Sequence, residues 1–513
     1  MRLIFCFFFT VHMIFGSYGQ TPVYFNKILS SIPGTSTIST VIEADSGYLL
    51  VVDNISTGQG IPHTLFLMTN LNGDIIDSAN FPDNKYRYTN AFPGNTILRT
   101  RSGNFVIATS RIDTSDAGYA VLMCLDTNLD TLWTRTFTHP DTVAATQPGA
   151  FVFFTQTAIR QTWDNGFIIA GNYSKDCIQG NSRSYLLKTD SLGVMEWIKK
   201  YNSIQQISAI ITSPDSGFFF PAYYNGQMSL IKTDPLGSIQ WSVKINSSTN
   251  PSFPTDLAIQ DDSNIVVVSG FWYDLTWNWR AVTVAKVNYI QPSKVWEKNY
   301  YLFRNFRSLT NHQIVSMHTL PDASIVIGSN SETLYDPMAP GGTAAYKGVM
   351  LKLSPDGDSL WARYYRYGLW NHVCQFEHMI PTADGGFLAV GFYWPWSTPA
   401  RPWLVKMDSL GCDTPECYLI GIEELSVRQH GDMTLYPNPF SHELNIVLPN
   451  GPAGATATLY DIQGRMMHQT RIPEFLYTEH YTLQTHDLPP GIYILQLVTK
   501  EGATHVGRVV RGN

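Results

Sequence analysis

The chain has 513 residues, too many for one ordinary hydrophobic core, so two domains or one large closed architecture with an appended module are expected. Charged residues make up 15% of the chain and aromatic residues 13%, a balance that favours an all-β extracellular protein over a helical one. The formal net charge of -7, without a long run of Lys or Arg, excludes nucleic acid as a partner.

The N-terminus has the pattern of a secretory signal peptide, which we place at residues 1–19. Arg2 precedes a short apolar run, and the small residues Ser17 and Gly19 suit cleavage before Gln20. The apolar run is too short to span a bilayer. We therefore expect a mature chain that passes through the periplasm and has no transmembrane segment.

Residues 20–420 contain a pattern that recurs seven times: a turn after an acidic or polar residue, an apolar strand, a variable loop, a second apolar strand, another tight turn, and a last strand. The first turn of each unit begins at Asp45, Ser102, Asp164, Asp215, Asp262, Asp322 and Asp384. Gly or Asn in these turns would supply the positive φ of a tight hairpin. With the strand before the turn, each unit has four strands in roughly 45 to 65 residues, as in a β-propeller blade.

The seventh unit runs through Gly411 and lacks its fourth strand, which in other units is opened by a Trp such as Trp197. Val23–Ile28 resembles that missing strand and has no turn before it. We therefore predict that Val23–Ile28 completes the seventh blade and closes the ring, which removes an open sheet edge. An open array or a sandwich is the competing assignment.

Two segments of the repeat, Asp-x-Gly-Phe and Lys-Thr-Asp-x-Leu-Gly, resemble the delta-60-like propeller repeats of large secreted bacterial proteins. The resemblance implies architecture and little chemistry, because propellers serve as enzymes, lectins and scaffolds. At the end of the repeats, Cys412 and Cys417 are close enough for a local disulfide, whereas the pairing of Cys124, Cys177 and Cys374 stays open.

After a polar linker at residues 421–433, residues 434–513 have short strands separated by turn clusters, which predicts a small immunoglobulin-like β-sandwich. Four motifs occur there in order: Tyr436-Pro437-Asn438-Pro439, a segment with Tyr460, Asp461, Gly464 and Arg465, a segment with Gly491 and Tyr493, and the terminal Val509-Val510-Arg511. They resemble the type A C-terminal sorting domain of the type IX secretion system. The resemblance implies the type IX machinery as a partner, export across the outer membrane, and release or attachment at the cell surface.

The sequence contains no motif for a nucleophile elbow, a zinc protease or a phosphate loop. His372, Glu377 and His378 are of metal-ligand types, but hydrogen-bonded side chains beside an innermost strand explain them more simply. We therefore predict neither a cofactor nor a metal nor a catalytic residue.

A polar position recurs near the start of each innermost strand, and we expect it to line the axial channel: Thr40, Thr96, Thr157, Ser208, Asp256, Ser316 and Glu377. Solvation of the channel is the plain explanation for this ring. A sharper hypothesis is that Asp256 and Glu377 hold a cation or an amine near the axis.

Aromatic residues gather in the loops opposite the tight turns, and they are the candidate binding residues: Trp272, Tyr273, Trp277, Trp279, Trp370, Trp394, Trp396 and Trp403. Flat aromatic rings stack on sugars and anchor protein interfaces, although they also cap blade ends. We therefore predict a secreted or surface binding protein for a glycan or a protein. The alternatives are a polysaccharide-active enzyme using carboxylates such as Asp256 and Glu377, and a structural propeller without a small ligand.

Overall fold

The computed structural model describes the chain in segments, and all statements below refer to them. These segments are residues 23–32, 34–55, 63–80, 87–89, 95–112, 118–137, 153–174, 183–246, 251–274, 279–300, 314–333, 345–368, 372–395, 397–415, 433–447, 454–461, 465–473, 480–485, 488–499 and 504–512. Within them every regular element is a β-strand, and no helix is long and apolar enough to cross a bilayer. The chain divides into two compact units, Met1–Pro415 and Glu416–Asn513, which we call the ring unit and the tail unit.

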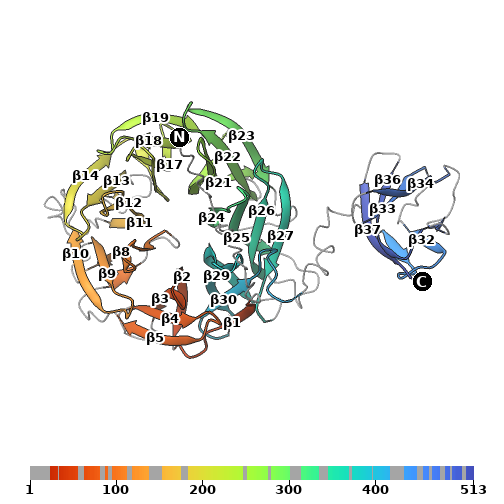
Figure 1. Cartoon of the computed structure of the whole chain (residues 1–513), viewed down its shortest axis with the longest axis horizontal. Helices are drawn as coiled ribbons and strands as arrows, with labels where there is room; N and C mark the ends of the chain where they lie inside the picture. Colours follow the sequence, from red (N-terminus) through yellow and green to blue (C-terminus); the bar gives the residue numbers. More distant parts are fainter. Residues whose placement is uncertain are drawn as a thin grey trace, which may run out of the picture. The chain divides into compact units, whose positions relative to one another are not determined.

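The ring unit is built from small antiparallel sheets that follow one another in chain order (Figure 1). The first contains β2 (Thr35–Ala44), β3 (Gly47–Ile55), β4 (His63–Asn70) and β5 (Ile75–Asn80). In the second, β6 (Arg87–Thr89) and β7 (Ile97–Arg99) both pair with β8 (Phe105–Ile112), which is followed by β9 (Gly118–Leu125) and β10 (Thr131–Phe137). The third contains β11 (Phe153–Gln161), β12 (Phe167–Ser174), β13 (Arg183–Thr189) and β14 (Met195–Tyr201).

The next sheets repeat the same order. In the fourth, β15 (Ile204–Gln205) and β16 (Ile211–Thr212) pair with β17 (Phe218–Tyr224), followed by β18 (Gln227–Thr233) and β19 (Ile239–Lys244). The fifth contains β20 (Pro251–Ile259), β21 (Asn264–Asp274), β22 (Trp279–Asn288) and β23 (Ser293–Tyr300). An eight-stranded sheet joins β24 (Ile314–Thr319), β25 (Ile325–Thr333), β26 (Ala345–Leu353) and β27 (Ser359–Tyr365) to β28 (Val373–Pro381), β29 (Phe387–Trp394), β30 (Arg401–Met407) and β1 (Phe25–Ile28). Its halves meet through one parallel residue pair, Tyr346 with Val373.

The first strand of the chain pairs with the last strand of the ring unit. β1 runs antiparallel to β30, with Phe25 opposite Lys406 and Ile28 opposite Trp403. The prediction that this segment supplies the missing outer strand is confirmed by this pairing. Figure 1 shows β1 beside β30 at the outer edge of the ring, where β5, β10, β14 and β19 occupy the same place in their own sheets.

Hydrophobic clusters fill the spaces between neighbouring sheets and continue around the ring. Leu49 of β3 packs in one cluster with Phe105 of β8, and Phe167 of β12 packs in the next with Val106. The first and last sheets share a cluster that contains Leu50 and Leu388. The ring is thus closed by apolar burial as well as by the β1–β30 pairing, an all-β arrangement compatible with a propeller.

The Gly of the Asp-x-Gly turns is explained by the close approach of a neighbouring strand. In the turn at Asp164 the positive φ of 64° belongs to Asn165, not to the following glycine. A Cβ on Gly166 would instead lie 2.1 Å from the carbonyl oxygen of Thr189. In this turn Asn165 supplies the expected positive φ, and Gly166 lets two strands approach closely.

The Asp of the tight turn forms an ion pair with a buried Lys in the third strand of the sheet. Lys406 Nζ lies 2.7 Å from Asp384 Oδ2 and donates to the Met407 carbonyl at 3.2 Å. Lys188 makes the same contact with Asp164 at 2.8 Å. Each of these Lys residues thus ties the tight turn of its sheet to the third strand, and that is why the two segments recur together.

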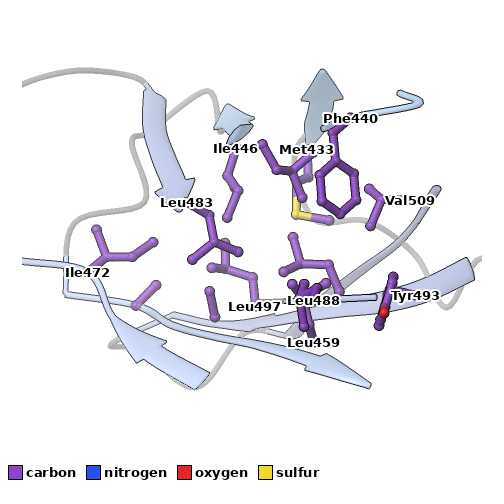
Figure 2. Packing of buried hydrophobic residues seen from close by; sticks show 14 residues of the cluster. Met433, Phe440, Ile446, Leu459, Ile472, Leu483, Leu488, Tyr493, Leu497 and Val509 are labelled. Carbon is purple, nitrogen blue, oxygen red and sulfur yellow. The ribbon is translucent and has the colours of Figure 1, made fainter. Parts of the chain in front are cut away.

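The tail unit contains two sheets that share one core. One sheet has β31 (Thr434–Tyr436), β32 (Glu443–Val447) and β35 (His480–Gln484), and the other has β34 (Met466–Arg471), β33 (Thr456–Asp461), β36 (Gly491–Val498) and β37 (Thr504–Arg511). Figure 2 shows Ile446 and Leu483 of the first sheet facing Leu459 and Leu497 of the second. Apolar residues from both sheets are therefore buried against each other.

Candidate functional site

Five innermost strands of the ring, β2, β11, β20, β24 and β28, have a bulge beside the recurring polar position. The register of β11 skips Thr157 between Gln156 and Ala158, and that of β28 skips Glu377 between Phe376 and His378. In a bulge one residue is left out of the ladder, and the alternation of side chains shifts by one.

The predicted channel column therefore mixes two registers. Thr157 and Glu377 are the bulged residues, whereas Thr40, Asp256 and Ser316 each follow a bulge in β2, β20 and β24. The two remaining members lie outside the strands: Thr96 precedes β7 and Ser208 lies between β15 and β16. Asp256 and Ser316 lie six residues before the turn residues Asp262 and Asp322, whereas Thr157 and Glu377 lie seven before Asp164 and Asp384, so the predicted column joined positions one residue apart.

The residues after the bulges connect each sheet to the next one. Asp256 Oδ2 accepts a hydrogen bond of 2.9 Å from the backbone N–H of Met317. Ser316 Oγ accepts one of 3.1 Å from Met379 N–H in the same way. These polar side chains satisfy backbone donors of the neighbouring innermost strand, so they brace the inner wall of the ring.

At the junction of the last and first sheets, this acceptor is a histidine. His378, only 7% exposed, accepts a hydrogen bond of 3.2 Å at Nδ1 from Val41 N–H, and Thr40 Oγ1 lies 3.1 Å from the same nitrogen. Burial, with a smaller contribution from the nearby His318 and Arg160, lowers the pKa of His378 to about 3. The imidazole is therefore neutral near pH 7, as the bond from Val41 requires.

Asp256 is the centre of a charged group inside the ring. Its Oδ1 accepts hydrogen bonds from Leu257 N–H at 2.9 Å and from Asn95 Nδ2 at 3.4 Å, and Asn95 Oδ1 accepts one from Arg160 at 2.7 Å. Burial raises the pKa of Asp256, while the charges of Arg160 and His318 oppose this change. Both carboxylate oxygens are thus engaged by donors of the protein itself.

Glu377 has a different environment. Burial and the neighbouring carboxylate of Asp53 raise the pKa of Glu377 to about 8, so its protonated form dominates at neutral pH. A protonated carboxyl is a poor cation ligand. The described residues contain no group of three or more potential metal ligands.

The candidate aromatic residues are placed as follows. Trp272 and Tyr273 lie in β21 and Trp279 begins β22, while Trp277, Trp370 and Trp396 lie outside the described residues. Trp394 ends β29 and is 36% exposed. Trp403 requires a correction: it is 0% exposed, stacks on Phe376 at 4.9 Å between ring centroids and donates to Asn26 Oδ1 at 2.8 Å. It is a core residue.

An aromatic cluster of Tyr367, His372 and Tyr393 lies at the end of β29, and the exposed Trp394 is the next residue of the strand. Tyr393 Oη is 2.6 Å from His372 Nδ1, and its ring meets that of Tyr367 edge to face at 5.3 Å. Burial lowers the pKa of His372 and raises that of Tyr393, so both groups are neutral near pH 7. The cluster combines flat rings with polar atoms, the combination that suits sugar rings and protein surfaces.

Sequence reasoning considered His372 only as a metal-ligand type. The hairpin of β28 and β29 brings it close to Tyr393, because Val373 pairs with Trp394 and Cys374 with Tyr393. The Asp-x-Gly turn at Asp384 predicts this hairpin, and the bulge at Glu377 then shifts its register by one residue.

The cysteines agree with only part of the expected pattern. Cys412 is disulfide-bonded, but its expected partner Cys417 and the unassigned Cys177 lie outside the described residues. Cys124 and Cys374 are buried thiols, and burial raises the pKa of each to about 11. They are therefore unreactive structural residues.

The motifs of the tail unit form turns and contacts along its strands. Asp461 Oδ1 accepts from Arg465 N–H at 2.9 Å, and Tyr493 Oη donates to the Pro489 carbonyl at 2.5 Å. Tyr460 Oη lies 3.2 Å from Gln496 Oε1, and Gly464 lies outside the described residues.

Comparison with known proteins identifies part of the chain. Residues 434–511 match the family described as secretion system C-terminal sorting domain. No curated protein matches the chain. The match does not cover the ring unit, so its resemblance to delta-60-like repeats stays a prediction.

Solved structures resemble the chain only distantly. A protein of unknown function from Bacteroides caccae has a TM-score of 0.36 at 12% identity, covering 66% of this chain and 97% of its own. A prolyl endopeptidase has a TM-score of 0.39 at 10% identity, covering 82% of this chain and 56% of its own. A protein from Lactobacillus plantarum has a TM-score of 0.37 at 10% identity, with coverages of 64% and 88%. At these TM-scores no activity is transferred to this chain.

Proposed function

Since residues 434–511 form a type IX secretion sorting domain, we propose that this chain is exported to the cell surface or the medium, where its ring acts as a non-catalytic binding protein. In this proposal the mature chain begins after residue 19, residues 20–420 form a seven-bladed propeller, and residues 434–513 form an immunoglobulin-like sandwich. The repeated four-stranded sheets and the cyclic packing of their cores support the propeller.

The exposed Trp394 at the end of β29 is the observation that carries the binding function. The preceding residue, Tyr393, is buried and is held by His372 and the Tyr367 ring, so the strand end that carries Trp394 is ordered before a ligand binds. We infer that the ligand is a glycan or a protein that stacks on Trp394.

The enzyme alternative needs two carboxyl groups that face one cleft, about 5 to 10 Å apart, with one of them ionised. Both carboxylate oxygens of Asp256 accept hydrogen bonds from the protein, and the pKa of Glu377 is raised to about 8, so Glu377 is protonated at neutral pH. These contacts favour binding over hydrolysis. A purely structural propeller is the remaining alternative, and the experiment below separates it.

The test compares the full chain with Trp394→Ala on a glycan array and in capture of surface proteins from the same host. We expect a bound ligand whose affinity falls about five- to hundredfold in Trp394→Ala, as for an exposed aromatic anchor. Trp163→Ala is the matched control, because Trp163 is 61% exposed at a tight turn, on the opposite ends of the strands.

Unchanged affinity in Trp394→Ala would contradict the assignment of Trp394. Absence of any ligand would favour the structural alternative, and release of shortened oligosaccharides would favour the enzyme.

A further inference from the structure

Two sequence motifs from opposite ends of the tail unit meet through a single side chain. Asn438, in Tyr-Pro-Asn-Pro, accepts a hydrogen bond of 2.8 Å at Oδ1 from Val510 N–H. Its Nδ2 donates to the Arg508 carbonyl at 3.1 Å. The N–H of one residue and the C=O two residues earlier point to the same side of a strand, so this amide occupies the place of a neighbouring strand.

Backbone contacts continue this pairing toward the C-terminus. Phe440 N–H donates to the Val510 carbonyl at 2.8 Å, and Gly512 N–H donates to the Phe440 carbonyl at 2.9 Å. Arg511 Nε donates to the Ser441 carbonyl at 2.9 Å. Phe440 and Val509 are both buried in the core shown in Figure 2, so the segment that carries Asn438 is itself anchored.

The contact with Asn438 matters because β37 lies at the edge of its sheet. β37 is the last strand in the order β34-β33-β36-β37, so Asn438 and Phe440 cover an edge that would otherwise be unpaired. An uncovered edge strand at a chain end opens locally at low cost in free energy. Asn438 itself is exposed, so its amide contributes hydrogen bonds to β37 and no apolar burial to the core.

We propose that Asn438 is a positioning residue of the export signal: it fixes β37 so that the secretion machinery recognises one composite surface from both motifs. This inference rests on the proposed export function. In this proposal Tyr-Pro-Asn-Pro acts by holding the terminal strand in place. The proposal follows from the side-chain amide of Asn438, which offers both a donor and an acceptor at strand spacing.

The test uses the full chain in a host with type IX secretion and measures the exported fraction, the thermal unfolding of the tail unit and hydrogen exchange at Val510. Asn438→Ala should raise exchange at Val510 about five- to tenfold or more and lower export in parallel, because two exposed hydrogen bonds are lost. Asn438→Asp keeps the acceptor but loses the donor, so it should lie between the native chain and Asn438→Ala in both measurements.

Asn445→Ala is the matched control. Asn445 Oδ1 accepts a hydrogen bond of 2.7 Å from Thr482 in the other sheet, away from β37. We expect Asn445→Ala to be exported normally even where it lowers thermal stability as much as Asn438→Ala.

Three outcomes would overturn the proposal: normal export of Asn438→Ala despite fast exchange at Val510, unchanged exchange at Val510, or an equal export defect in Asn445→Ala. Deletion of residues 435–513 tests the underlying function separately. If this deletion leaves export intact, the export function itself fails, whatever the behaviour of Asn438.

Discussion

Replacing His378 by Asn should remove the contribution of this one buried imidazole to the pH dependence of the ring unit. The Oδ1 of Asn can occupy the place of the imidazole Nδ1, so it can still accept the hydrogen bond from Val41 N–H, which is 3.2 Å long in the native chain. Asn does not titrate. The substitution therefore keeps the hydrogen bond but removes the titrating group, so it isolates the effect of protonation on stability.

The magnitude follows from the pKa of His378, which burial lowers from 6.5 to about 3. Because the folded state disfavours the proton, this contribution to stability is fully present above pH 6.5 and is lost as the pH falls toward 3. At pH 5 the unfolded chain binds this proton and the folded chain does not, so His378 alone lowers the free energy of unfolding by about 2 kcal/mol relative to pH 8. His378→Asn should remove this contribution, whereas Glu377, whose pKa is raised to about 8, contributes with the opposite sign in both the native chain and the variant.

The assay is denaturant unfolding at pH 8 and pH 5, followed by tryptophan fluorescence. All 13 Trp residues precede residue 415, so the signal reports on the ring unit alone. His378→Leu is the companion variant: it leaves Val41 N–H unpaired and should cost about 1 to 3 kcal/mol at both pH values. If the change in the free energy of unfolding between pH 8 and pH 5 is the same in His378→Asn as in the native chain, His378 does not contribute to it and the reasoning is refuted.

Two further changes test the closure and the turns of the ring. Removal of Val23–Ile28 should lower the free energy of unfolding by several kcal/mol, since β30 loses its partner strand and the packing of Phe25, and unchanged thermal unfolding would contradict the closure. Gly386→Ala should cost more than Gly385→Ala, which strains only the φ of 81° and should cost about 1 to 2 kcal/mol. At Gly386 the added Cβ lies 2.1 Å from the Met407 carbonyl oxygen, so equal denaturation midpoints for the two variants would count against the steric reasoning.

The repeated strands were predictable because their signals are local. Turn residues and apolar runs mark the hairpins, and the absence of a fourth strand in the last unit predicted the pairing of β1 with β30. The tail unit was predictable for a related reason, because its motifs define its turns.

The inner positions and the aromatic residues were harder to predict because they depend on contacts between distant segments. Asp256 lies six residues before its turn residue Asp262 and Glu377 seven before Asp384, so the predicted column joined a residue that follows a bulge with a residue that is itself bulged. Trp403 was expected on the surface, but Asn26 of β1 and Phe376 of β28 enclose it. Neither partner is near Trp403 in the sequence.

The pairing of β1 with β30 also determines how the ring responds to mechanical force. Phe25 lies opposite Lys406 and Ile28 opposite Trp403, so the chain enters β1 and leaves β30 at the same end of the pair. A pull on the two chain ends would load the hydrogen bonds one after another, as in unzipping, and not all at once, as in shear. Such a pull would therefore detach β1 first and open the ring at its weakest mechanical point, before the sheets unravel in turn.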